Sequence, residues 1–381
     1  MEENKKNKVP NVPNLRFPHF IDRWVKKKVR DLTKTSTGAT PKTSKAEYWN
    51  GNIRWMNSGE LNLKHIYEVE GRITKLGYNS TSTKMLPVNC VLIGLAGQGK
   101  TRGTCAINHV ELCTNQSIAA IWPCMQLNSL FLYYNLESRY KELREISSGE
   151  GGRGGLNLPL INNLYIPMCS LEEQSKIATF LNLIEERIAT QNKIIEELER
   201  LKKSIYQSIA VLCREIKKEQ LISLCTITTG KRDANEGSID GQYPFFTCSK
   251  ETTKIGTYTF DGPSLLISGN GEIGQVKYYN GKFDAYQRTY VLQNFVLNPL
   301  YVKIWLEIML PARIHREQNV GAMPYIVIST LADLFIPVTD ISMQNKIVNV
   351  IKSVESKIQE NKKLVIFLEK QKCYLLNNLF I

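Results

Sequence analysis

The sequence contains few of the residues from which metal centres and nucleophilic active sites are built. Among its 381 residues there are four histidines, and none of the nine cysteines belongs to a Cys-x-x-Cys pair. Zinc sites and thiol–imidazole sites depend on such residues at defined spacings. No Ser/His/Asp set and no carboxylate cluster typical of metal nucleases stands out either. We therefore predict a protein that holds no metal and has no catalytic activity of its own.

The cysteines are odd in number, and most of them stand in apolar segments. This pattern is typical of reduced core residues and not of a disulfide framework. The sequence also lacks an apolar run long enough to cross a bilayer, and its start, MEENKKNK, has no signal peptide. These absences predict a cytoplasmic protein without a membrane partner.

Positive charge, by contrast, is abundant. The formal net charge is +13, and residues 1–30 hold nine lysines and arginines against three acidic residues. Because the basic excess extends beyond this one tail, it favours a polyanionic partner, either a nucleic acid or an acidic membrane face. A basic protein that is merely well solvated is the alternative explanation.

Two segments of the chain resemble each other, one starting at Ile166 and the other at Ile336. They align at a constant offset of 170 residues. Identical residues at this offset include Pro167/Pro337, Gln174/Gln344, Lys176/Lys346, Ile177/Ile347, Glu185/Glu355, Lys193/Lys363, Leu198/Leu368 and Glu199/Glu369. An internal repeat of this kind decides the predicted fold more than any single motif does.

Each copy of the repeat has the features of a long helix. Ser170 and Asp340 are residue types preferred at helix N-caps, and Ser170 with Glu173 forms the pattern of a capping box. Apolar residues then recur at alternating intervals of four and three, which is the seam of a coiled coil. The predicted seam consists of Ile177, Leu181, Ile184, Ile188, Gln191, Ile195 and Leu198 in the first copy and Ile347, Ile351, Val354, Ile358, Asn361, Val365 and Leu368 in the second.

The simplest arrangement pairs these two helices with each other. We predict an antiparallel pair, while a parallel or a homodimeric coiled coil remains an alternative. In an antiparallel pair with flush ends, Gln191 and Asn361 come near the common midpoint. Two amides at matching positions of a seam would then fix its register.

The repeat divides the chain into four parts, namely a globular region (1–165), a helix (166–212), a second globular region (213–335) and a second helix (336–381). Residues 1–14 are polar, basic and proline-containing, so we expect a disordered leader or a docking arm. The opening of the first region, residues 31–38, is echoed by residues 223–230. This second offset is 192 residues, which makes the first region 22 residues longer between shared landmarks.

Both globular regions show the same order of predicted elements. A β-branched strand runs into a glycine-rich turn, and further strands, a helix and a glycine-containing loop follow before the last strand. The predicted helices cover residues 126–146 and 299–310. The order predicts an α+β fold with a mostly antiparallel or irregular sheet. Two copies of one scaffold with different loops are expected when related modules read different ligands.

Residues 94–101 match the phosphate-loop pattern G-x-x-x-x-G-K-T and follow a predicted strand. A phosphate loop must open a helix, whereas residues 102–110 have the pattern of another strand. The counterpart in the second region, residues 268–274, lacks the Lys-Thr and is typical of an Asn-Gly hairpin. We therefore favour a hairpin over an ATP site. Lys100 and Arg102 at its tip could contact a phosphate backbone or a base edge.

Other candidate nucleic-acid contacts lie in predicted loops. Loop 149–155 is rich in glycine and would let a nucleic acid approach its backbone, although a flexible connector explains it equally well. The polar residues after the second helix could read bases, but a solvated face is the ordinary explanation. The full set of candidates is Lys100, Arg102, Arg153, Lys231, Arg232, Lys277, Arg313, Arg316, Gln318 and Asn319.

Three of these features together resemble one known family. They are the repeated helix start at Ile166 and Ile336, the repeated Leu…Thr-Gly opening, and the segment Val-Pro-Asn-Leu-Arg-Phe-Pro18…Trp24. The chain resembles, over essentially its whole length, the specificity subunit of type I restriction–modification systems. The repeated helix is the specific part of this resemblance, and the N-terminal segment supports it.

The resemblance implies two target recognition domains, 1–165 and 213–335, each reading one half of a split double-stranded DNA target. It implies that the helices set the spacing between the halves and dock two modification subunits, which methylate DNA. S-adenosylmethionine would bind to those subunits, and ATP and Mg²⁺ to restriction or motor subunits, leaving no cofactor in this chain. The alternatives are a coiled-coil adaptor that does not read DNA and an ATPase that uses residues 94–101.

Overall fold

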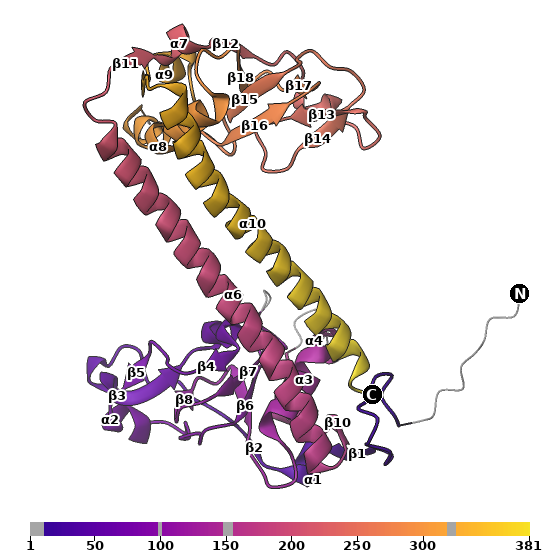
Figure 1. Ribbon diagram of the computed structural model, residues 1–381. Helices are drawn as coiled ribbons and strands as arrows, with labels where there is room; N and C mark the ends of the chain where they lie inside the picture. Colours follow the sequence, from indigo (N-terminus) through magenta and orange to yellow (C-terminus); the bar gives the residue numbers. More distant parts are fainter. Residues whose placement is uncertain (1–10, 98–100, 148–154, 318–324) are drawn as a thin grey trace, which may run out of the picture. The chain divides into compact units, whose positions relative to one another are not determined.

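The computed structural model describes residues 11–97, 101–147, 155–317 and 325–381. The chain forms two compact units (Figure 1). Unit 1 consists of Met1–Gln191 and Lys363–Ile381, and unit 2 of Asn192–Lys362. Each unit therefore contains one globular region together with parts of both long helices. The described residues include no helix with the length and apolarity that crossing a membrane requires.

Unit 1 contains three sheets and several short helices. The larger sheet has the order β2-β9-β6-β7-β4, the smaller one the order β5-β3-β8, and β1 pairs with β10. The elements of its globular region are β1 (Val25–Lys28), α1 (Val29–Leu32), β2 (Thr35–Thr37), η1 (Ala46–Tyr48), β3 (Trp49–Met56), η2 (Ser58–Leu63), β4 (His65–Ile66), β5 (Arg72–Ile73), α2 (Lys75–Asn79), β6 (Val91–Gly94), β7 (Cys105–Asn108), β8 (Cys113–Thr114), β9 (Ile118–Ile121), α3 (Ser129–Ser138), α4 (Tyr140–Ile146), α5 (Leu158–Asn162) and β10 (Tyr165–Met168).

Unit 2 repeats this plan. Its sheets have the orders β12-β18-β15-β16 and β14-β13-β17, and β11 pairs with β19. The elements are β11 (Lys218–Gln220), α7 (Leu221–Leu224), β12 (Thr226–Thr229), η3 (Ala234–Glu236), β13 (Tyr243–Phe246), β14 (Thr253–Ile255), β15 (Pro263–Ser268), β16 (Val276–Asn280), β17 (Asp284–Ala285), β18 (Thr289–Gln293), α8 (Pro299–Glu317), α9 (Ile328–Ala332) and β19 (Phe335–Pro337).

The two units match strand by strand. In both smaller sheets the central strand pairs antiparallel with one neighbour and parallel with the other. In both larger sheets the four shared strands are antiparallel to their neighbours. Unit 1 adds β4, which lies parallel to β7 and belongs to its longer globular region. The α+β fold with an internal repeat is thereby confirmed.

The repeated Thr-Gly opening has a structural cause in both units. A Cβ atom on Gly38 would lie 1.8 Å from the carbonyl oxygen of Thr114, and one on Gly230 would lie 2.0 Å from that of Ala285. Thr114 ends β8 and Ala285 ends β17, which are equivalent strands. Only glycine permits such a close approach of two backbone segments.

The core of each unit lies between its larger sheet and one helix. In unit 1, Phe131, Tyr133 and Tyr134 of α3 are completely buried in this core. In unit 2, α8 buries Tyr301 and Trp305 in the same way. Both cores extend to residues of the long helices, so each globular region is packed directly on the helix pair.

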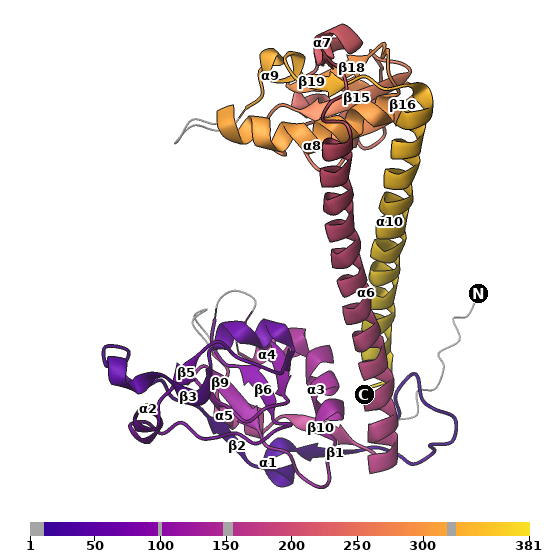
Figure 2. The ribbon, with the colours of Figure 1, turned by 60° about the vertical axis from the view of Figure 1, so that its left-hand side comes forward.

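The long helices are α6 (Leu171–Leu212) and α10 (Ile341–Asn378), and segments of the two lie side by side within each unit (Figure 2). They run antiparallel, since in unit 2 Glu199 pairs with Lys362 and the later Lys202 pairs with the earlier Glu355. Each helix has a side-chain N-cap. The Glu173 N–H donates to Ser170 Oγ (3.2 Å), and the Met343 N–H donates to Asp340 Oδ1 (3.0 Å).

The capping box at Ser170 is only half formed. The buried carboxylate of Glu173 does not turn back to the cap but accepts hydrogen bonds from Arg16 Nε (2.6 Å) and from Trp24 Nε1 (3.2 Å). A bidentate guanidinium compensates a buried carboxylate better than one N–H group does. Glu173 therefore ties the N-terminal segment to α6.

Most of the proposed seam is buried, and the rest is half-buried. The buried members are Ile177, Leu181, Ile195, Ile347, Ile351, Val354, Ile358, Val365 and Leu368. The half-buried ones are Ile184, Ile188, Gln191, Leu198 and Asn361. Asn361 Nδ2 donates to the Lys357 carbonyl of its own helix, and Gln191 Oε1, among the described residues, accepts no hydrogen bond. The role of the two amides in fixing the register stays a prediction.

Two helices differ from the sequence prediction. The segment expected to form one helix over 126–146 forms α3 and α4, which are separated at Arg139. Arg139 Nη1 donates to the Tyr165 carbonyl (2.8 Å), a tertiary contact that local propensity does not register. The other helix, α8, extends past the expected end at residue 310 because buried Leu306, Leu310 and Ile314 continue its apolar face. Pro311 lies within α8, although proline removes one backbone hydrogen bond.

Candidate nucleic-acid interface

The described residues on both sides of the phosphate-loop pattern belong to two neighbouring antiparallel strands. Among the described residues, 101–103 form a turn and β7 follows, pairing antiparallel with β6, whereas a phosphate loop would be followed by a helix. Gly94 has a packing reason, since a Cβ atom there would lie 2.1 Å from the Thr101 carbonyl oxygen. Arg102 is half-buried in the turn, and Lys100 lies outside the described residues. Gly94 of the pattern therefore reflects a close approach of the backbone to Thr101.

Lys277 forms contacts within unit 2. Its Nζ donates to the carbonyls of Ser249 (3.0 Å) and Lys250 (2.9 Å), and burial lowers the pKa of this ammonium group. Two carbonyls of a neighbouring loop already take part of its hydrogen-bonding capacity. Lys277 therefore holds loop 249–250 against β16.

Arg232 is similarly used inside unit 2. Its Nε lies 3.2 Å from Asp284 Oδ2, and the Asp284 side chain is fully buried. The guanidinium also contacts Glu236 (3.1 Å) and Thr257 (2.9 Å). The hydrogen bond to Asp284 raises the pKa of Arg232 above its ordinary value. This arginine compensates a buried carboxylate, a role that the sequence did not indicate.

The polar cluster predicted after the second helix lies partly within that helix. Arg313 and Arg316 belong to the last turns of α8. Arg313 is paired with Glu317 four residues later, and Arg316 Nε donates to the Ala312 carbonyl (3.3 Å). The correction follows from the unexpected length of α8. Gln318 and Asn319, like Arg153 and most of loop 149–155, lie outside the described residues.

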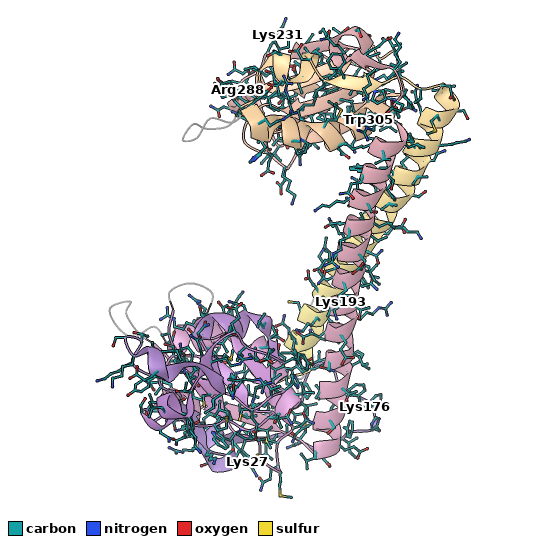
Figure 3. All side chains as sticks on the ribbon, turned by 90° about the vertical axis from the view of Figure 1, so that its left-hand side faces the viewer. Lys27, Lys176, Lys193, Lys231, Arg288 and Trp305 are labelled. Atoms are coloured by element: carbon teal, nitrogen blue, oxygen red, sulfur yellow. The ribbon has the colours of Figure 1, made fainter. Side chains whose placement is uncertain are left out.

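An exposed surface cluster in unit 2 consists of Lys231, which was a predicted candidate, and of Gln287 and Arg288, which were not. The Gln287 N–H donates to the Arg232 carbonyl (2.9 Å), which places the β17–β18 turn beside the segment that contains Lys231. Lys231, Gln287 and Arg288 are all exposed, and Figure 3 shows Lys231 and Arg288 projecting from the surface of unit 2. In the sequence, Gln287 and Arg288 could have been recognised as a Gln-Arg pair in a turn between two predicted strands.

The equivalent turn of unit 1, between β8 and β9, carries different side chains. Its exposed residue is Gln116, whose Oε1 accepts a hydrogen bond from the Thr40 hydroxyl (2.6 Å). The backbone is held in the same way in both turns. The Asn115 N–H donates to the last residue of β3, Met56, and the Tyr286 N–H donates to the last residue of β13, Phe246. The scaffold is thus repeated while the side chains presented at the turn are not.

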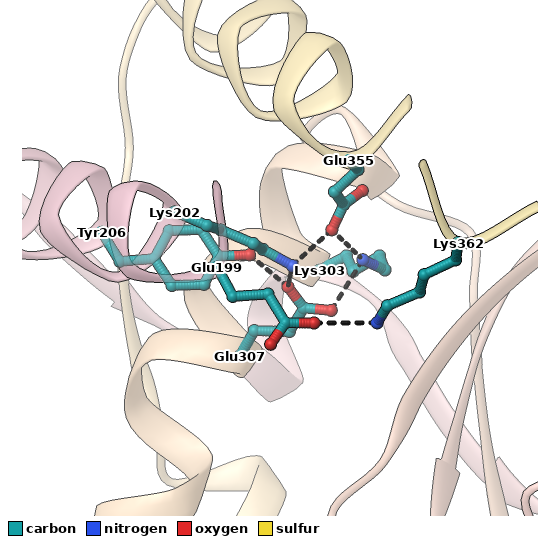
Figure 4. A network of polar contacts seen from close by, with 7 residues as sticks. All are labelled: Glu199, Lys202, Tyr206, Lys303, Glu307, Glu355 and Lys362. Carbon is teal, nitrogen blue, oxygen red and sulfur yellow. Dashed lines mark hydrogen bonds and ion pairs between the residues drawn. The ribbon is translucent and has the colours of Figure 1, made fainter. Parts of the chain in front are cut away.

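A network of charged side chains joins the globular region of unit 2 to both long helices (Figure 4). Lys202 of α6 lies 2.5 Å from Glu355 of α10 and 3.4 Å from Glu307 of α8. Lys303 of α8 contacts the same two carboxylates at 3.5 Å and 2.7 Å. The Tyr206 hydroxyl donates a further hydrogen bond to Glu307.

Unit 1 contains the same triad. Lys372 of α10 lies 3.1 Å from Glu185 of α6 and 3.0 Å from Glu137 of α3. Lys372, Glu137 and Glu185 stand at the 170-residue offset from Lys202, Glu307 and Glu355 respectively. Of these three pairs, the internal repeat in the sequence analysis includes only Glu185 with Glu355. We call these two sets the helix triads.

In each helix triad the pKa of the lysine is raised and that of one glutamate is lowered, which favours their ionised forms. Burial would raise the pKa of Glu185, but the hydrogen bond from His65 and the charge of Lys372 lower it to about 2. Burial would lower the pKa of Lys372, but Glu137 and Glu185 raise it above its ordinary value. The same balance raises the pKa of Lys202 and lowers that of Glu307.

In unit 1, two further basic residues contact the glutamates of the triad, and both belong to the globular region. Lys64 lies 3.2 Å from Glu137, and His65 Nε2 lies 3.4 Å from Glu185 Oε2. His65 Nδ1 is in turn 2.9 Å from His109 Nε2, with the two rings stacked. Burial and the neighbouring His65 lower the pKa of His109. In unit 2 the additional cation is Lys303, which contacts both carboxylates.

The repeated glutamines also have equivalent positions. Gln174 Oε1 accepts from the Asn128 N–H, and Gln344 Oε1 accepts from the Asn298 N–H, both at 2.8 Å. Asn128 caps α3 and Asn298 precedes α8, so each glutamine links a long helix to the start of the adjacent globular helix. Both glutamines are buried. The identity at this offset therefore reflects a structural role.

All nine cysteines are free, and six of them are buried. Burial raises the pKa of most of these thiols, for example that of Cys90 to about 12. Among the residues that the structure describes, no three His, Cys, Asp or Glu side chains are grouped so that they could hold a metal ion.

Comparison with known proteins gives a consistent result. The model of the family described as "Type I restriction modification DNA specificity domain" matches twice, over residues 21–200 and 214–370. The EcoDI specificity subunit of Escherichia coli is 33% identical over 146 residues, which are 38% of this chain and 32% of that protein. The MjaIX specificity subunit of Methanocaldococcus jannaschii is 29% identical over 209 residues, 52% of this chain and 46% of that protein. The chain thus aligns with about a third to a half of the length of these relatives.

Solved structures share the fold over nearly the whole chain. An S subunit of a type I restriction–modification system from M. genitalium has a TM-score of 0.69 at 17% identity, covering 97% of this chain and 99% of that one. A second structure, described as the structural basis of complex assembly and conformational transition of the type I R-M system, has a TM-score of 0.58 at 14% identity, with 96% and 99% covered.

Proposed function

The chain belongs to the family of type I restriction modification DNA specificity domains, and from this premise we propose that it is the DNA-reading subunit of a type I restriction–modification complex. Each globular region would read one half of a split double-stranded target. The observation that carries this proposal is the repetition of one scaffold with the same strand order in both units and different side chains on equivalent turns.

The exposed β17–β18 turn is the proposed reading element of unit 2. The long polar side chains of Gln287 and Arg288 and the cation of Lys231 are exposed there. Arginine binds guanine and glutamine binds adenine through paired hydrogen bonds in the major groove, while lysine neutralises phosphates. The equivalent turn of unit 1 presents Gln116, so the two units would read different half-sites. Double-stranded DNA is accordingly the proposed ligand.

Methylation and cleavage would be the work of partner subunits. We assign S-adenosylmethionine to two modification subunits, and ATP and Mg²⁺ to restriction or motor subunits. This chain would contribute no cofactor and no catalytic residue. The pairing of β6 with β7 supports this assignment, because the described residues after the phosphate-loop pattern lead into a strand, whereas a nucleotide site of this type needs a helix there.

The surface of the helix pair in unit 1 suits a protein partner. A groove of about 830 Å³ lies between α6 and α10, and its apolar lining includes Phe180, Leu183, Phe367 and Tyr374. Phe367 and Tyr374 are 55% and 61% exposed, although large aromatic residues are typical of interface cores. The charged residues that line the groove are the cations Arg187 and Lys370. We propose that a modification subunit docks here through a helix with an apolar face and acidic flanks.

Mapping of methylated bases tests the proposed function directly. Genomic DNA would be sequenced from cells that express the modification subunit with and without this chain. A split motif with a fixed gap that requires the chain is the expected result. Methylation that does not change when the chain is removed would contradict the proposal and favour a coiled-coil adaptor.

A further inference from the structure

We propose that the two helix triads are positioning devices that hold each globular region at one angle on the helix pair, and that they thereby restrict the gap between the two DNA half-sites. This inference rests on the proposed function, because it concerns how a split target is read. The residues involved are Lys372, Glu137 and Glu185 in unit 1 and Lys202, Glu307 and Glu355 in unit 2.

Each triad connects three elements at one point. In unit 2, Glu307 comes from globular helix α8, Glu355 from α10, which follows the same globular region, and Lys202 from α6. In unit 1 the corresponding elements are α3, α6 and α10. A triad therefore joins a globular region both to its own long helix and to the other one. Lys362 and Glu199, by comparison, join only the two long helices.

Stability alone does not account for these triads. The side chains of Lys372, Glu137 and Glu185 are 13%, 15% and 20% exposed, so their charges are largely removed from water. The desolvation cost of such groups offsets much of their attraction, and apolar replacements of buried ion pairs are often neutral or stabilising. The same arrangement nevertheless occurs in both units at a constant sequence offset.

The triads restrict the orientation of each globular region, which the apolar contacts alone do not. The hydrophobic contacts of α3 and α8 with the long helices are non-directional and tolerate small rotations. An ammonium group that must lie within 3.4 Å of two carboxylates on two different helices does not tolerate them. Rotation of a globular region would leave a partly buried charge without its partner, which is strongly unfavourable.

The effect on DNA reading follows from helix dimensions. A gap longer by one base pair moves a half-site by roughly 3.4 Å along the axis and by about 35° around it. A globular region that can tilt on its helix pair can accept part of this displacement. A region held by its triad cannot, so the complex rejects targets with the wrong gap.

The test is methylation mapping of the complete complex with one triad neutralised. The quadruple variant Lys202→Met, Lys303→Met, Glu307→Gln, Glu355→Gln removes all three charges of the unit 2 triad. It also removes the charge of Lys303, which contacts the same two carboxylates and would otherwise be left unpaired. Lys362→Met is the matched control, because it breaks the more exposed pair with Glu199 near the same site. The single variant Lys202→Met supplies a second measurement if the quadruple variant does not fold, because Lys303 still contacts both glutamates in it.

We expect both half-site sequences to remain and the share of sites methylated with a gap one base pair longer or shorter to rise at least about tenfold, which corresponds to about 1.4 kcal/mol of lost discrimination. The control should keep the original gap. An unchanged gap in a folded, methylating variant would contradict the inference, as would loss of all methylation by a folded variant that still binds its modification subunits. A wild-type complex that methylates no split motif would refute the proposed function itself, so the two failures are distinguishable.

Discussion

The two units attach their globular regions to the long helices in the same way, but they differ in the side chains that they expose to solvent. The helix triads, the buried glutamines and the close backbone contacts of Gly38 and Gly230 are equivalent in both units. The β8–β9 turn of unit 1 and the β17–β18 turn of unit 2 carry different side chains. The exposed surface of the helix pair also differs between the two units. The comparison indicates that the junction of globular region and helix pair is the constant part of the design, and the exposed surface the variable part.

The largest effect is expected where the two units agree most closely. Gly230→Ala should lower the free energy of unfolding by about 2–3 kcal/mol, because the added methyl group would lie 2.0 Å from the Ala285 carbonyl oxygen and overpacking is costly. Gly38→Ala should have an effect of similar size in unit 1. Denaturant unfolding of each variant measures these changes.

Gly256→Ala is the control for this comparison, since a Cβ atom there meets no other atom within 4 Å. We expect it to change the unfolding free energy by less than about 0.5 kcal/mol. If Gly38→Ala and Gly230→Ala were as mild as the control, the two close approaches would not be the reason for the repeated glycines.

A somewhat smaller effect is expected at the helix surface, where the units differ. Phe367→Ala combined with Tyr374→Ala should weaken binding of one modification subunit by about 2 kcal/mol, roughly 30-fold, because exposed aromatic residues commonly provide most of the energy of an interface. A titration of the modification subunit followed by the mass of the complexes measures this loss. The expected product is a complex that has lost one of its two modification subunits.

Residues at the equivalent positions of unit 2 provide the matched control. The 170-residue offset pairs Phe367 with Glu197 and Tyr374 with Ser204. The variant Glu197→Ala with Ser204→Ala should change binding by no more than about threefold, since polar rim contacts contribute little. Equal losses in both variants would show that the aromatic groove is not the distinguishing feature of unit 1.

The smallest effect concerns the acid stability of unit 1. The folded-state pKa of Glu185 is lowered to about 2, so its contribution to stability is fully present above its unfolded pKa of about 4.3 and is lost as pH falls towards 2. Over this window we expect the wild type to lose on the order of 2 kcal/mol more than Glu185→Gln does. Urea unfolding at pH 6 and pH 3 measures the difference.

An exposed carboxylate on the same helix serves as the control for the pH experiment. Glu196→Gln should leave the acid dependence of the wild type unchanged, because Glu196 is exposed. A Glu185→Gln variant with the same acid dependence as the wild type would mean that the contacts of Glu185 with His65 and Lys372 do not stabilise its ionised form.

Regular spacing made much of the fold predictable from the sequence. The constant offset located both long helices, and intervals of four and three marked residues such as Leu181 and Ile351, which are buried. The strand predicted after residue 101 is present as β7. Helix ends were less predictable, because the break at Arg139 depends on the distant Tyr165 and the extension of α8 depends on core packing beyond Pro311.

The candidate DNA contacts were harder to predict, because charge alone does not show where a side chain points. Arg232 and Lys277 bind groups of their own unit, whereas Arg288 is exposed and was not predicted. The helix triads could not be predicted from the sequence for another reason. Lys202 and Lys372 follow the offset, but their partners Glu307 and Glu137 are distant in sequence, and only the fold brings them together.

The most direct test of the central claim, that each unit reads one half of the target, is methylation mapping with the double variant Gln287→Ala, Arg288→Ala. Loss of a good base contact costs about 1–3 kcal/mol of discrimination at the position it reads. We predict that one half of the motif becomes degenerate while the other half and the gap stay unchanged. Equal degeneracy in both halves, or an unchanged motif, would contradict the account.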